Sequence, residues 1–167
     1  MAYDPQSWQN FYLMTGGAAA ALAGLLFVAM SLHAKTIASH PFYVRRAVGT
    51  LASLTTQLLI SAAVLVPGQP LAWLGIEVEI GAAFFLVVSI VNSVRSGGYR
   101  AGLLSRSRTR TAVEVVGGSI WIALFLATGI SLIVREGGGF YLLAADMAFM
   151  FGWNIYTAWT LVTEVSE

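Results

Sequence analysis

Over residues 12–32 the chain reads YLMTGGAAAALAGLLFVAMSL, a stretch without a charged side chain. An α-helix needs about 20 consecutive apolar residues to cross the ~30 Å hydrocarbon core of a bilayer, and this run has that length. Asp4 precedes it and no lysine or arginine does, whereas a cleaved secretory signal starts with basic residues and has a shorter apolar region. The stretch therefore predicts a membrane helix that the mature protein keeps.

The composition of the whole chain points to lipid as its solvent. Of its 167 residues 57% are hydrophobic and only 10% are charged, and the mean hydropathy is +0.76. Too little polar surface remains to cover a water-soluble globule. The formal net charge of +1 gives no reason to expect nucleic acid as a partner. The expected partner is the lipid bilayer.

The sequence lacks the residues and motifs of common cofactor and catalytic sites. It has no cysteine, which excludes disulfides, thiolate metal sites and iron–sulfur clusters. His33 and His40 have no further imidazole or acid at a ligand spacing, so no metal site is expected. Phosphate-binding loops, dinucleotide-binding glycine patterns and a His-Glu-x-x-His motif are missing from the sequence, so we expect neither a cofactor nor enzymatic activity.

Four further apolar runs follow the first, each about as long as a membrane span. The five predicted spans are residues 12–32, 44–66, 71–94, 112–134 and 140–162. Proline and glycine at residues 67–70, and three glycines at 137–139, separate two pairs of spans so tightly that antiparallel hairpins are expected. We therefore predict an all-α fold, an integral membrane bundle of five transmembrane helices that forms one domain over residues 1–167.

The basic residues are distributed unevenly between the connections. All but one lie between the first and second spans or between the third and fourth: Lys35, Arg45, Arg46, Arg95, Arg100, Arg106, Arg108 and Arg110. The last connection holds only Arg135. Because cytoplasmic connections are enriched in lysine and arginine, the N-terminus is predicted outside and the C-terminus in the cytoplasm. The predicted location is the cell membrane, as a multi-pass protein of a prokaryotic inner or plasma membrane.

Aromatic residues lie near the predicted ends of several spans. They are Trp8, Phe11, Tyr12, Trp73, Phe140, Tyr141 and Trp159. Amphipathic rings favour the interface between membrane and water. These residues therefore predict aromatic belts at both membrane surfaces.

One face of the second span is polar from end to end. At ~100° per residue, positions three or four apart share a helical face. The residues with this spacing are Thr50, Ser53, Gln57 and Ser61. Two interpretations stay open: these groups line a path across the membrane, or they join helices at roughly 0.6 kcal/mol per contact.

The fifth span has a similar polar stripe. Its members include Asp146, Thr157 and Thr160. An ionisable group about two turns inside the membrane is costly unless it pairs, binds a proton or faces water, which makes Asp146 a candidate functional residue. Glu77 and Glu79 are predicted in the same outer half. Either the three acids form a vestibule for cations or protons, or a salt-bridged cluster forms around Arg135.

Small residues four positions apart predict close helix packing. On the first span they are Gly16, Ala20 and Gly24, and on the fifth span Ala144, Ala148 and Gly152. Such spacing lets another backbone approach closely. Whether that backbone belongs to the same chain or to another subunit stays open.

The leading functional hypothesis is a small channel or carrier for protons or small cations that works as a homo-oligomer. The two polar stripes would line the path, and the three acids would concentrate cations at its outer mouth. One alternative is a non-catalytic accessory or assembly subunit, which packs its glycine and alanine faces against a larger membrane complex. Another is a receptor for a hydrophobic ligand, with Trp121 and Trp153 lining a dry closed pocket.

Overall fold

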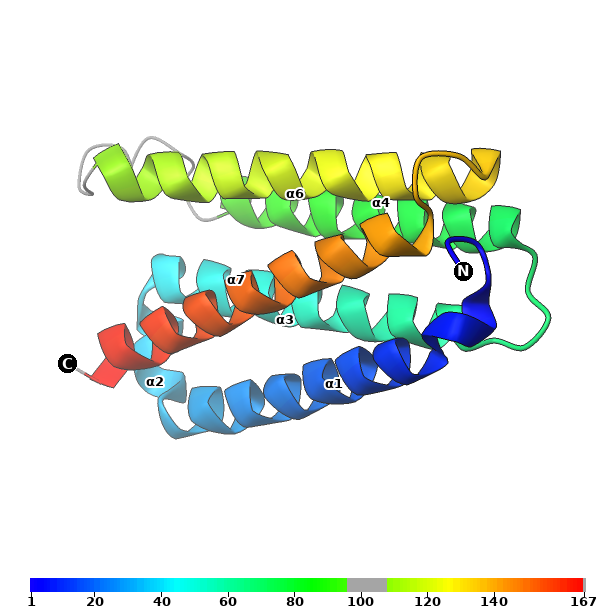
Figure 1. The fold of residues 1–167 in the computed structure, drawn as a ribbon. Helices are drawn as coiled ribbons and strands as arrows, with labels where there is room; N and C mark the ends of the chain where they lie inside the picture. Colours follow the sequence, from blue (N-terminus) through cyan, green and yellow to red (C-terminus); the bar gives the residue numbers. More distant parts are fainter. Residues whose placement is uncertain (96–107, 167) are drawn as a thin grey trace.

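The computed structural model is all-α, which confirms this part of the predicted fold class. It describes residues 1–95 and 108–166, apart from the side chains of residues 89, 92–95, 108–119 and 165–166. This part of the chain forms six α-helices and a short 3-10 helix (Figure 1). They are η1 (Pro5–Trp8), α1 (Gln9–Leu32), α2 (Ala34–Ser39), α3 (Pro41–Val64), α4 (Leu71–Arg95), α6 (Arg108–Val134) and α7 (Phe140–Ser166). Most of the predicted basic connection, residues 96–107, lies outside the described residues.

Three helices in the described part are long and apolar enough to cross a membrane: Pro5–Leu32, Pro41–Val64 and Leu71–Val88. Within α6, Ile120–Val134 forms a shorter apolar helix. α7 is 27 residues long, but Asp146 and the polar residues that follow it lower its hydropathy, and it is not among the three. Helix length and composition therefore indicate a multi-pass membrane protein.

Proline and glycine set several helix ends. α3 begins at Pro41, before the apolar run at residue 44, because the fixed φ of proline suits the first turn of a helix. Gly137, Gly138 and Gly139 adopt φ values of 85°, 120° and 50°, and the chain reverses there between α6 and α7. Glycine reaches these angles without a steric penalty. The short α2 lies in the connection between α1 and α3, where no helix was predicted.

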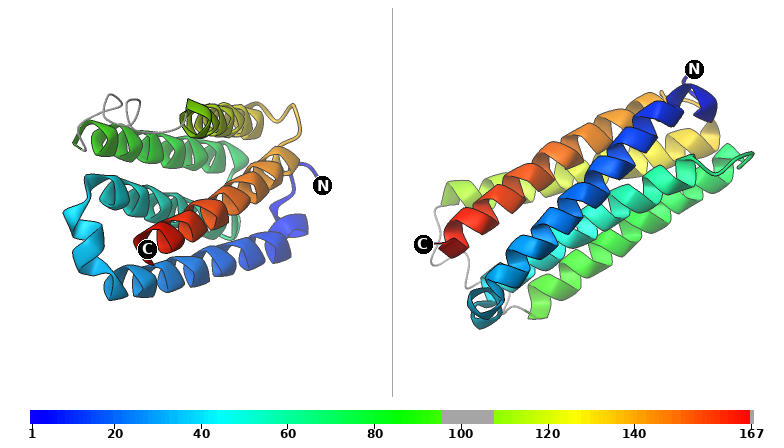
Figure 2. Two further views of the ribbon diagram at one scale, coloured as in Figure 1. Left: turned by 90° about the vertical axis from the view of Figure 1, so that its left-hand side faces the viewer. Right: turned by 90° about the horizontal axis from the view of Figure 1, so that it is seen from below.

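The long helices run antiparallel to their neighbours in the chain (Figure 1). The N-terminus, the α3–α4 turn and the α6–α7 turn lie at one end of the bundle, which we call the N-terminal end. α2 and the C-terminus lie at the other, the C-terminal end. α3 is central, because it contacts α1, α4 and α7. The side views place α4 and α6 on one side of α3 and α7, and α1 on the other (Figure 2).

Two groups of buried apolar side chains join the helices. The larger group, which includes Phe125 and Leu143, lies toward the N-terminal end and joins α1, α3, α4, α6 and α7. The smaller group, which includes Ala19 and Leu161, joins α1, α2, α3 and α7 toward the C-terminal end. Because lipid tails are as apolar as leucine, such contacts stabilise a membrane bundle through close packing rather than removal from water.

The outer surface of the bundle is rich in large apolar side chains. On α1, Leu25 is 70% exposed and Phe27 65%, and on α4 Ile80 is 62% exposed. Soluble monomers rarely expose so many large apolar side chains together. This surface supports the lipid bilayer as the partner of these helices.

The aromatic residues divide into two groups rather than one belt at each end. Trp73 and Trp159 are exposed near opposite ends of the bundle, as an aromatic belt requires. Tyr12 and Phe140 are fully buried and belong to the larger apolar group. These two rings are buried because they meet inside the bundle, where α1 and α7 come together at the N-terminal end. Their ring centroids are 5.9 Å apart.

Candidate functional site

The polar face of α3 is turned into the bundle. Thr50, Ser53, Gln57 and Ser61 are all at most 5% exposed. Leu59, on another face of the same helix, is 58% exposed. A helix at the surface of a water-soluble protein has its polar face outside, whereas the polar face of α3 is inside. The reason is that polar side chains in lipid find hydrogen-bonding partners only inside the protein.

Asp146 of α7 and Tyr12 of α1 are both fully buried. Neither side chain has any exposed surface. Neither the hydroxyl of Tyr12 nor either carboxylate oxygen of Asp146 has a hydrogen-bonding partner among the described residues. Two groups that normally require partners therefore lie unsatisfied inside the bundle.

Three further buried side chains link α1, α3 and α7 at this level. The hydroxyls of Thr15 and Ser61 lie 3.3 Å apart, between α1 and α3. Nε2 of Gln57 donates to the carbonyl of Met147 at 2.7 Å, between α3 and α7. We call Tyr12, Thr15, Gln57, Ser61 and Asp146 the interior polar cluster.

The cluster has spare hydrogen-bonding capacity beyond Asp146. Oε1 of Gln57 has no partner in the described part of the chain. Nδ2 of Asn154, about two turns further along α7, also lacks a partner there, although this side chain is only 1% exposed. An unmade hydrogen bond in an apolar interior costs about 1–3 kcal/mol, so the free groups of Gln57 and Asn154 add to the hydrogen-bonding capacity of this region.

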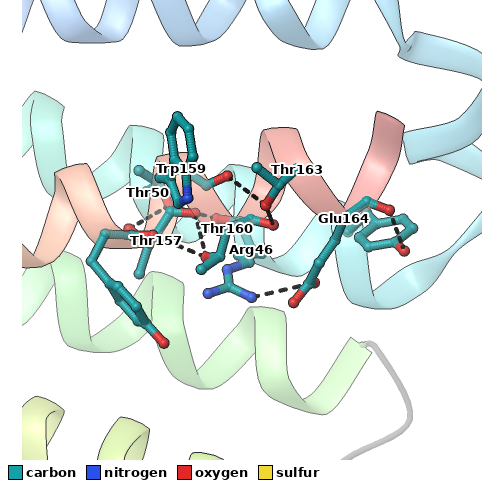
Figure 3. Close-up of polar contacts among 9 residues, drawn as sticks. Arg46, Thr50, Thr157, Trp159, Thr160, Thr163 and Glu164 are labelled. Carbon is teal, nitrogen blue, oxygen red and sulfur yellow. Dashed lines mark hydrogen bonds and ion pairs between the residues drawn. The ribbon is translucent and has the colours of Figure 1, made fainter. Parts of the chain in front are cut away.

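Toward the C-terminal end, α3 and α7 share a polar interface (Figure 3). Oγ1 of Thr50 donates to the carbonyl of Arg46 at 2.9 Å and lies 3.3 Å from Oγ1 of Thr157. Nη1 of Arg46 lies 3.6 Å from Oε2 of Glu164, and the Arg46 side chain is only 9% exposed. The hydroxyl of Tyr43 donates to the carbonyl of Glu164 at 3.2 Å. A second set of polar contacts between α3 and α7 thus lies toward the C-terminal end, separate from the interior polar cluster.

Thr160 satisfies its hydroxyl within α7. Its Oγ1 lies 3.0 Å from the carbonyl of Tyr156 and 3.1 Å from that of Thr157, and the side chain is half-buried (Figure 3). Among the described residues no hydrogen bond connects Thr160 to α3. The structure therefore brings Thr50 and Thr157 together but leaves Thr160 outside their interface.

The predicted outer acids do not gather around Asp146. Glu77 is exposed, and it accepts a hydrogen bond from Nε2 of Gln69 at 2.6 Å. Glu79 lies against Gly129 of α6, with Oε1 buried and without a partner in the described residues. Within residues 1–95 and 108–166, no group of three acidic, histidine or cysteine side chains is arranged to hold a metal ion.

Arg135 does not neutralise Asp146. Its side chain is exposed, its φ is 62°, and its backbone N–H donates to the carbonyl of Ser131 at 2.9 Å where α6 ends. In the described part of the chain no ion pair joins Arg135 to Asp146. The salt-bridged cluster considered from the sequence is not present among these residues.

Residues 1–8, which we call the N-terminal cap, cover the end of the bundle next to the interior polar cluster. The N–H of Phe140 donates to the carbonyl of Ala2 at 2.8 Å, and that of Gly138 donates to the hydroxyl of Tyr3 at 3.0 Å. The Trp8 ring packs edge-on against that of Tyr141, with 4.8 Å between centroids. These contacts hold the cap on the α6–α7 turn.

Asp4 starts the helical part of this cap. Its carboxylate accepts hydrogen bonds from the hydroxyl of Ser7 at 2.5 Å and from the N–H of Gln6 at 3.1 Å. Because these bonds favour the charged carboxylate, that of Ser7 most, they lower the pKa of Asp4. Asp4 therefore caps η1 as an anion at neutral pH.

The members of the two small-residue stripes divide between the interior of the bundle and its outer surface. Gly16 is buried against Ser61, where a Cβ would lie 2.8 Å from the Cβ of the serine, and Ala144 is half-buried. The other members are exposed: Ala20, Gly24, Ala148 and Gly152. No atom of another helix lies within 4 Å of a Cβ built at Gly24 or Gly152. Among the glycines of these two stripes, Gly16 is the one that lies directly against another helix of the same chain.

Trp121 and Trp153, the two tryptophans proposed for a ligand pocket, pack against aromatic rings in the described structure. Trp121 is buried between Phe85 and Phe125, with ring centroids 4.3 and 4.9 Å away. Trp153 is half-buried and packs on Tyr156. A small apolar pocket instead lies at the C-terminal end, lined by Leu26, Met30, His33, Ile37 and Leu161.

The sequence does not predict several residues of the site. Its aromatic pattern predicts Tyr12 in a belt at the membrane surface, and no pattern indicates Thr15, although it precedes the buried Gly16. The charge pattern indicates Arg46 only as a basic residue of a connection. Arg46 and Glu164 have opposite charges and lie at the same predicted membrane boundary. This combination is the sequence signal that would predict their ion pair.

No family model, curated protein or solved structure matches this chain. The helices and their hydropathy therefore define the class of the protein, a small multi-pass helical membrane protein. Within this class, the interior polar cluster is the feature that bears on the activity of the protein.

Proposed function

We propose that this protein carries protons or small cations across the cell membrane through the interface of α1, α3 and α7. The observation that carries the proposal is Asp146, a fully buried carboxyl group without a partner among the described residues. A bare carboxylate in an apolar interior is very costly, so a species that neutralises or solvates it has to bind there. A proton, a cation and water all meet that need.

The polar contacts along α3 support a route through a single chain. The interior polar cluster lies at the N-terminal end of this route, and Asn154, Thr50 and Thr157 continue it along α3 and α7. Arg46 and Glu164 lie at its other end. In this proposal the buried polar face of α3, which has members in both sets of contacts, supplies the polar lining that a conductor needs.

The proposed orientation follows from the distribution of charge over the two ends of the bundle. Lys35 of α2 and Arg45 and Arg46 of α3 lie toward the C-terminal end, where α4 ends at Arg95 and α6 begins at Arg108. Arg135 is at the N-terminal end. In this proposal the chain crosses the membrane five times. Because basic residues prefer the cytoplasmic side, its N-terminus is outside and its C-terminus is in the cytoplasm of a prokaryotic cell.

A second candidate function is that of a non-catalytic accessory subunit, alone or as a homo-oligomer. The observation that favours it is the exposed small-residue surface at Ala20 and Gly24 on α1 and Ala148 and Gly152 on α7. Small residues on an exposed membrane helix allow another helix to pack closely. This surface is compatible with transport, because the polar route lies inside one chain.

The decisive experiment measures ion flux into lipid vesicles that contain the purified protein. Asp146→Asn keeps the shape of the side chain and removes its charge, so flux is expected to fall toward that of protein-free vesicles. The matched control is Glu136→Gln, which neutralises an exposed acid at the same end of the bundle. Unchanged flux in a folded Asp146→Asn protein excludes transport through this site, and co-purification with one dominant membrane partner supports the accessory subunit.

A further inference from the structure

We propose that the transported species is the proton rather than a metal cation, that Asp146 is its binding site, and that Thr15 and Ser61 relay it between α1 and α3. This inference deepens the proposed function and rests on it. The packing of α1 against α3 and the chemistry of the interior polar cluster carry it.

The packing leaves no room for a metal ion with its ligands next to the hydroxyl pair. A Cβ built at Gly16 would lie 2.8 Å from the Cβ of Ser61, so the two helices already touch there. A sodium or potassium ion passes a selective site only when several oxygen atoms surround it in place of its water. That shell requires α1 and α3 to separate. A proton needs only oxygen atoms within hydrogen-bonding distance, as Thr15 and Ser61 are at 3.3 Å.

The chemistry of the cluster also favours a proton. Its members carry one carboxyl group, and otherwise only hydroxyl and amide groups. Calcium and magnesium ions bind where several oxygen ligands, usually with more than one carboxylate, converge. Glu77 is exposed and Glu79 packs on α6, so neither adds a second carboxylate within the described structure. One proton on one carboxylate oxygen neutralises Asp146 without any further ligand.

The transfer balances in atoms and charge. A hydronium ion gives its proton to a carboxylate oxygen of Asp146, which forms one O–H bond and leaves a water molecule. Transfer of this proton to a water molecule breaks that bond, restores the carboxylate and forms a new hydronium ion. This hydronium ion gives a proton to one hydroxyl oxygen of the pair Thr15 and Ser61, that residue releases its original proton to the other hydroxyl, and the second hydroxyl releases its own to water. The number of O–H bonds in the protein is therefore unchanged after one passage.

The test uses the purified full-length protein in vesicles of phosphatidylcholine and phosphatidylglycerol, with dyes for pH, sodium or potassium trapped inside. With equal metal-ion concentrations on both sides, a pH step outside is expected to change the internal pH faster than in protein-free vesicles. Thr15→Val keeps the shape and removes the hydroxyl, and proton flux should fall about tenfold or more. Thr15→Ser keeps the hydroxyl and should keep most of the flux.

The matched control is Thr56→Val. Thr56 is a buried hydroxyl on the same helix as Ser61, but it donates to the carbonyl of Ala52 at 2.9 Å and lies outside the interior polar cluster. This variant should leave proton flux unchanged. Circular dichroism and gel filtration confirm that each variant is folded before its flux is compared.

The outcomes separate this inference from the proposed function. Asp146-dependent flux of sodium or potassium at a rate similar to that of protons overturns the inference and leaves the proposed function standing. Proton flux that Thr15→Val does not change overturns the relay. The lack of flux for every ion overturns the proposed function, and this inference with it.

Discussion

Gly16 of α1 packs directly against Ser61 of α3. A Cβ at residue 16 would lie 2.8 Å from the Cβ of Ser61 and 3.4 Å from its hydroxyl oxygen, whereas no atom of another helix lies within 4 Å of a Cβ at Gly17. Two adjacent glycines on α1 therefore have opposite surroundings. One is a contact between helices, and the other faces outward.

Gly16→Ala is expected to destabilise the protein by ~1–3 kcal/mol, because the new methyl group overlaps Ser61 and forces α1 away from α3. Gly17→Ala is the control and should leave the free energy of unfolding unchanged or raise it slightly, since alanine favours the helix. Unfolding of both variants in detergent, followed by circular dichroism, measures the difference. Equal stability of the two variants would contradict the packing of Gly16.

Asp146→Asn is expected to leave the free energy of unfolding unchanged or to raise it. The carboxylate has no partner to lose among the described residues, and an asparagine avoids the burial of a charge. The melting temperature in detergent checks this. If Asp146 instead formed a buried ion pair with Arg135, the change would leave a charge unpaired and cost ~3–5 kcal/mol.

The double variant with Arg135→Gln distinguishes the two arrangements. An ion pair predicts that the second change restores the stability lost in the first. Because Arg135 is exposed, we expect the double variant to match Asp146→Asn. Recovery of a lowered melting temperature in the double variant would show that the pair exists.

Gly24→Leu tests whether the exposed small surface of α1 binds another subunit. We expect this change to reduce assembly more than Leu25→Ala, because a bulky side chain at Gly24 keeps a neighbouring backbone away. The free energy of unfolding of a single chain should stay unchanged or rise slightly, since no atom of another helix lies within 4 Å of a Cβ at Gly24 and leucine favours the helix. Particle size in detergent reports the effect. A Gly24→Leu protein that migrates as wild type shows that lipid covers this part of α1.

A reporter that is active only in the cytoplasm should work when fused after Glu167 and fail when fused before Met1. The basis is the concentration of basic residues toward the C-terminal end of the bundle. A reporter inserted within residues 97–107 should also be active, which tests the connection outside the described residues. An active N-terminal reporter would contradict five crossings, and the third predicted span, with Glu77 and Glu79, would be the first to reconsider.

The helices were predictable because their signals are local. Long apolar runs exclude water-exposed strands and loops, and the glycines at 137–139 reverse the chain through φ angles that other residues avoid. The spacing of the polar residues on α3 likewise defines one face from the sequence alone. This face is buried because the lipid around the bundle offers its polar side chains no hydrogen-bonding partners.

The contacts between helices were not predictable in the same way, because they depend on which faces meet. Gly75 and Gly129 lie in no pattern of small residues, yet a Cβ at Gly75 would lie 2.8 Å from the carbonyl oxygen of Gly129. Depth in the membrane suggested one vestibule for Glu79 and Asp146. Glu79 is instead packed on α6, whereas Asp146 is fully buried on α7, and only the arrangement of the helices separates them.

The central position of α3 has a consequence for how the chain is made. α3 leaves the ribosome before α7, but the carbonyl of Met147 that Gln57 binds belongs to α7. Until α7 inserts, the amide of Gln57 and the hydroxyl of Thr50 lack their partners on that helix. The polar interface between α3 and α7 therefore forms only after α7 has been made, although α3 is among the first helices to be translated.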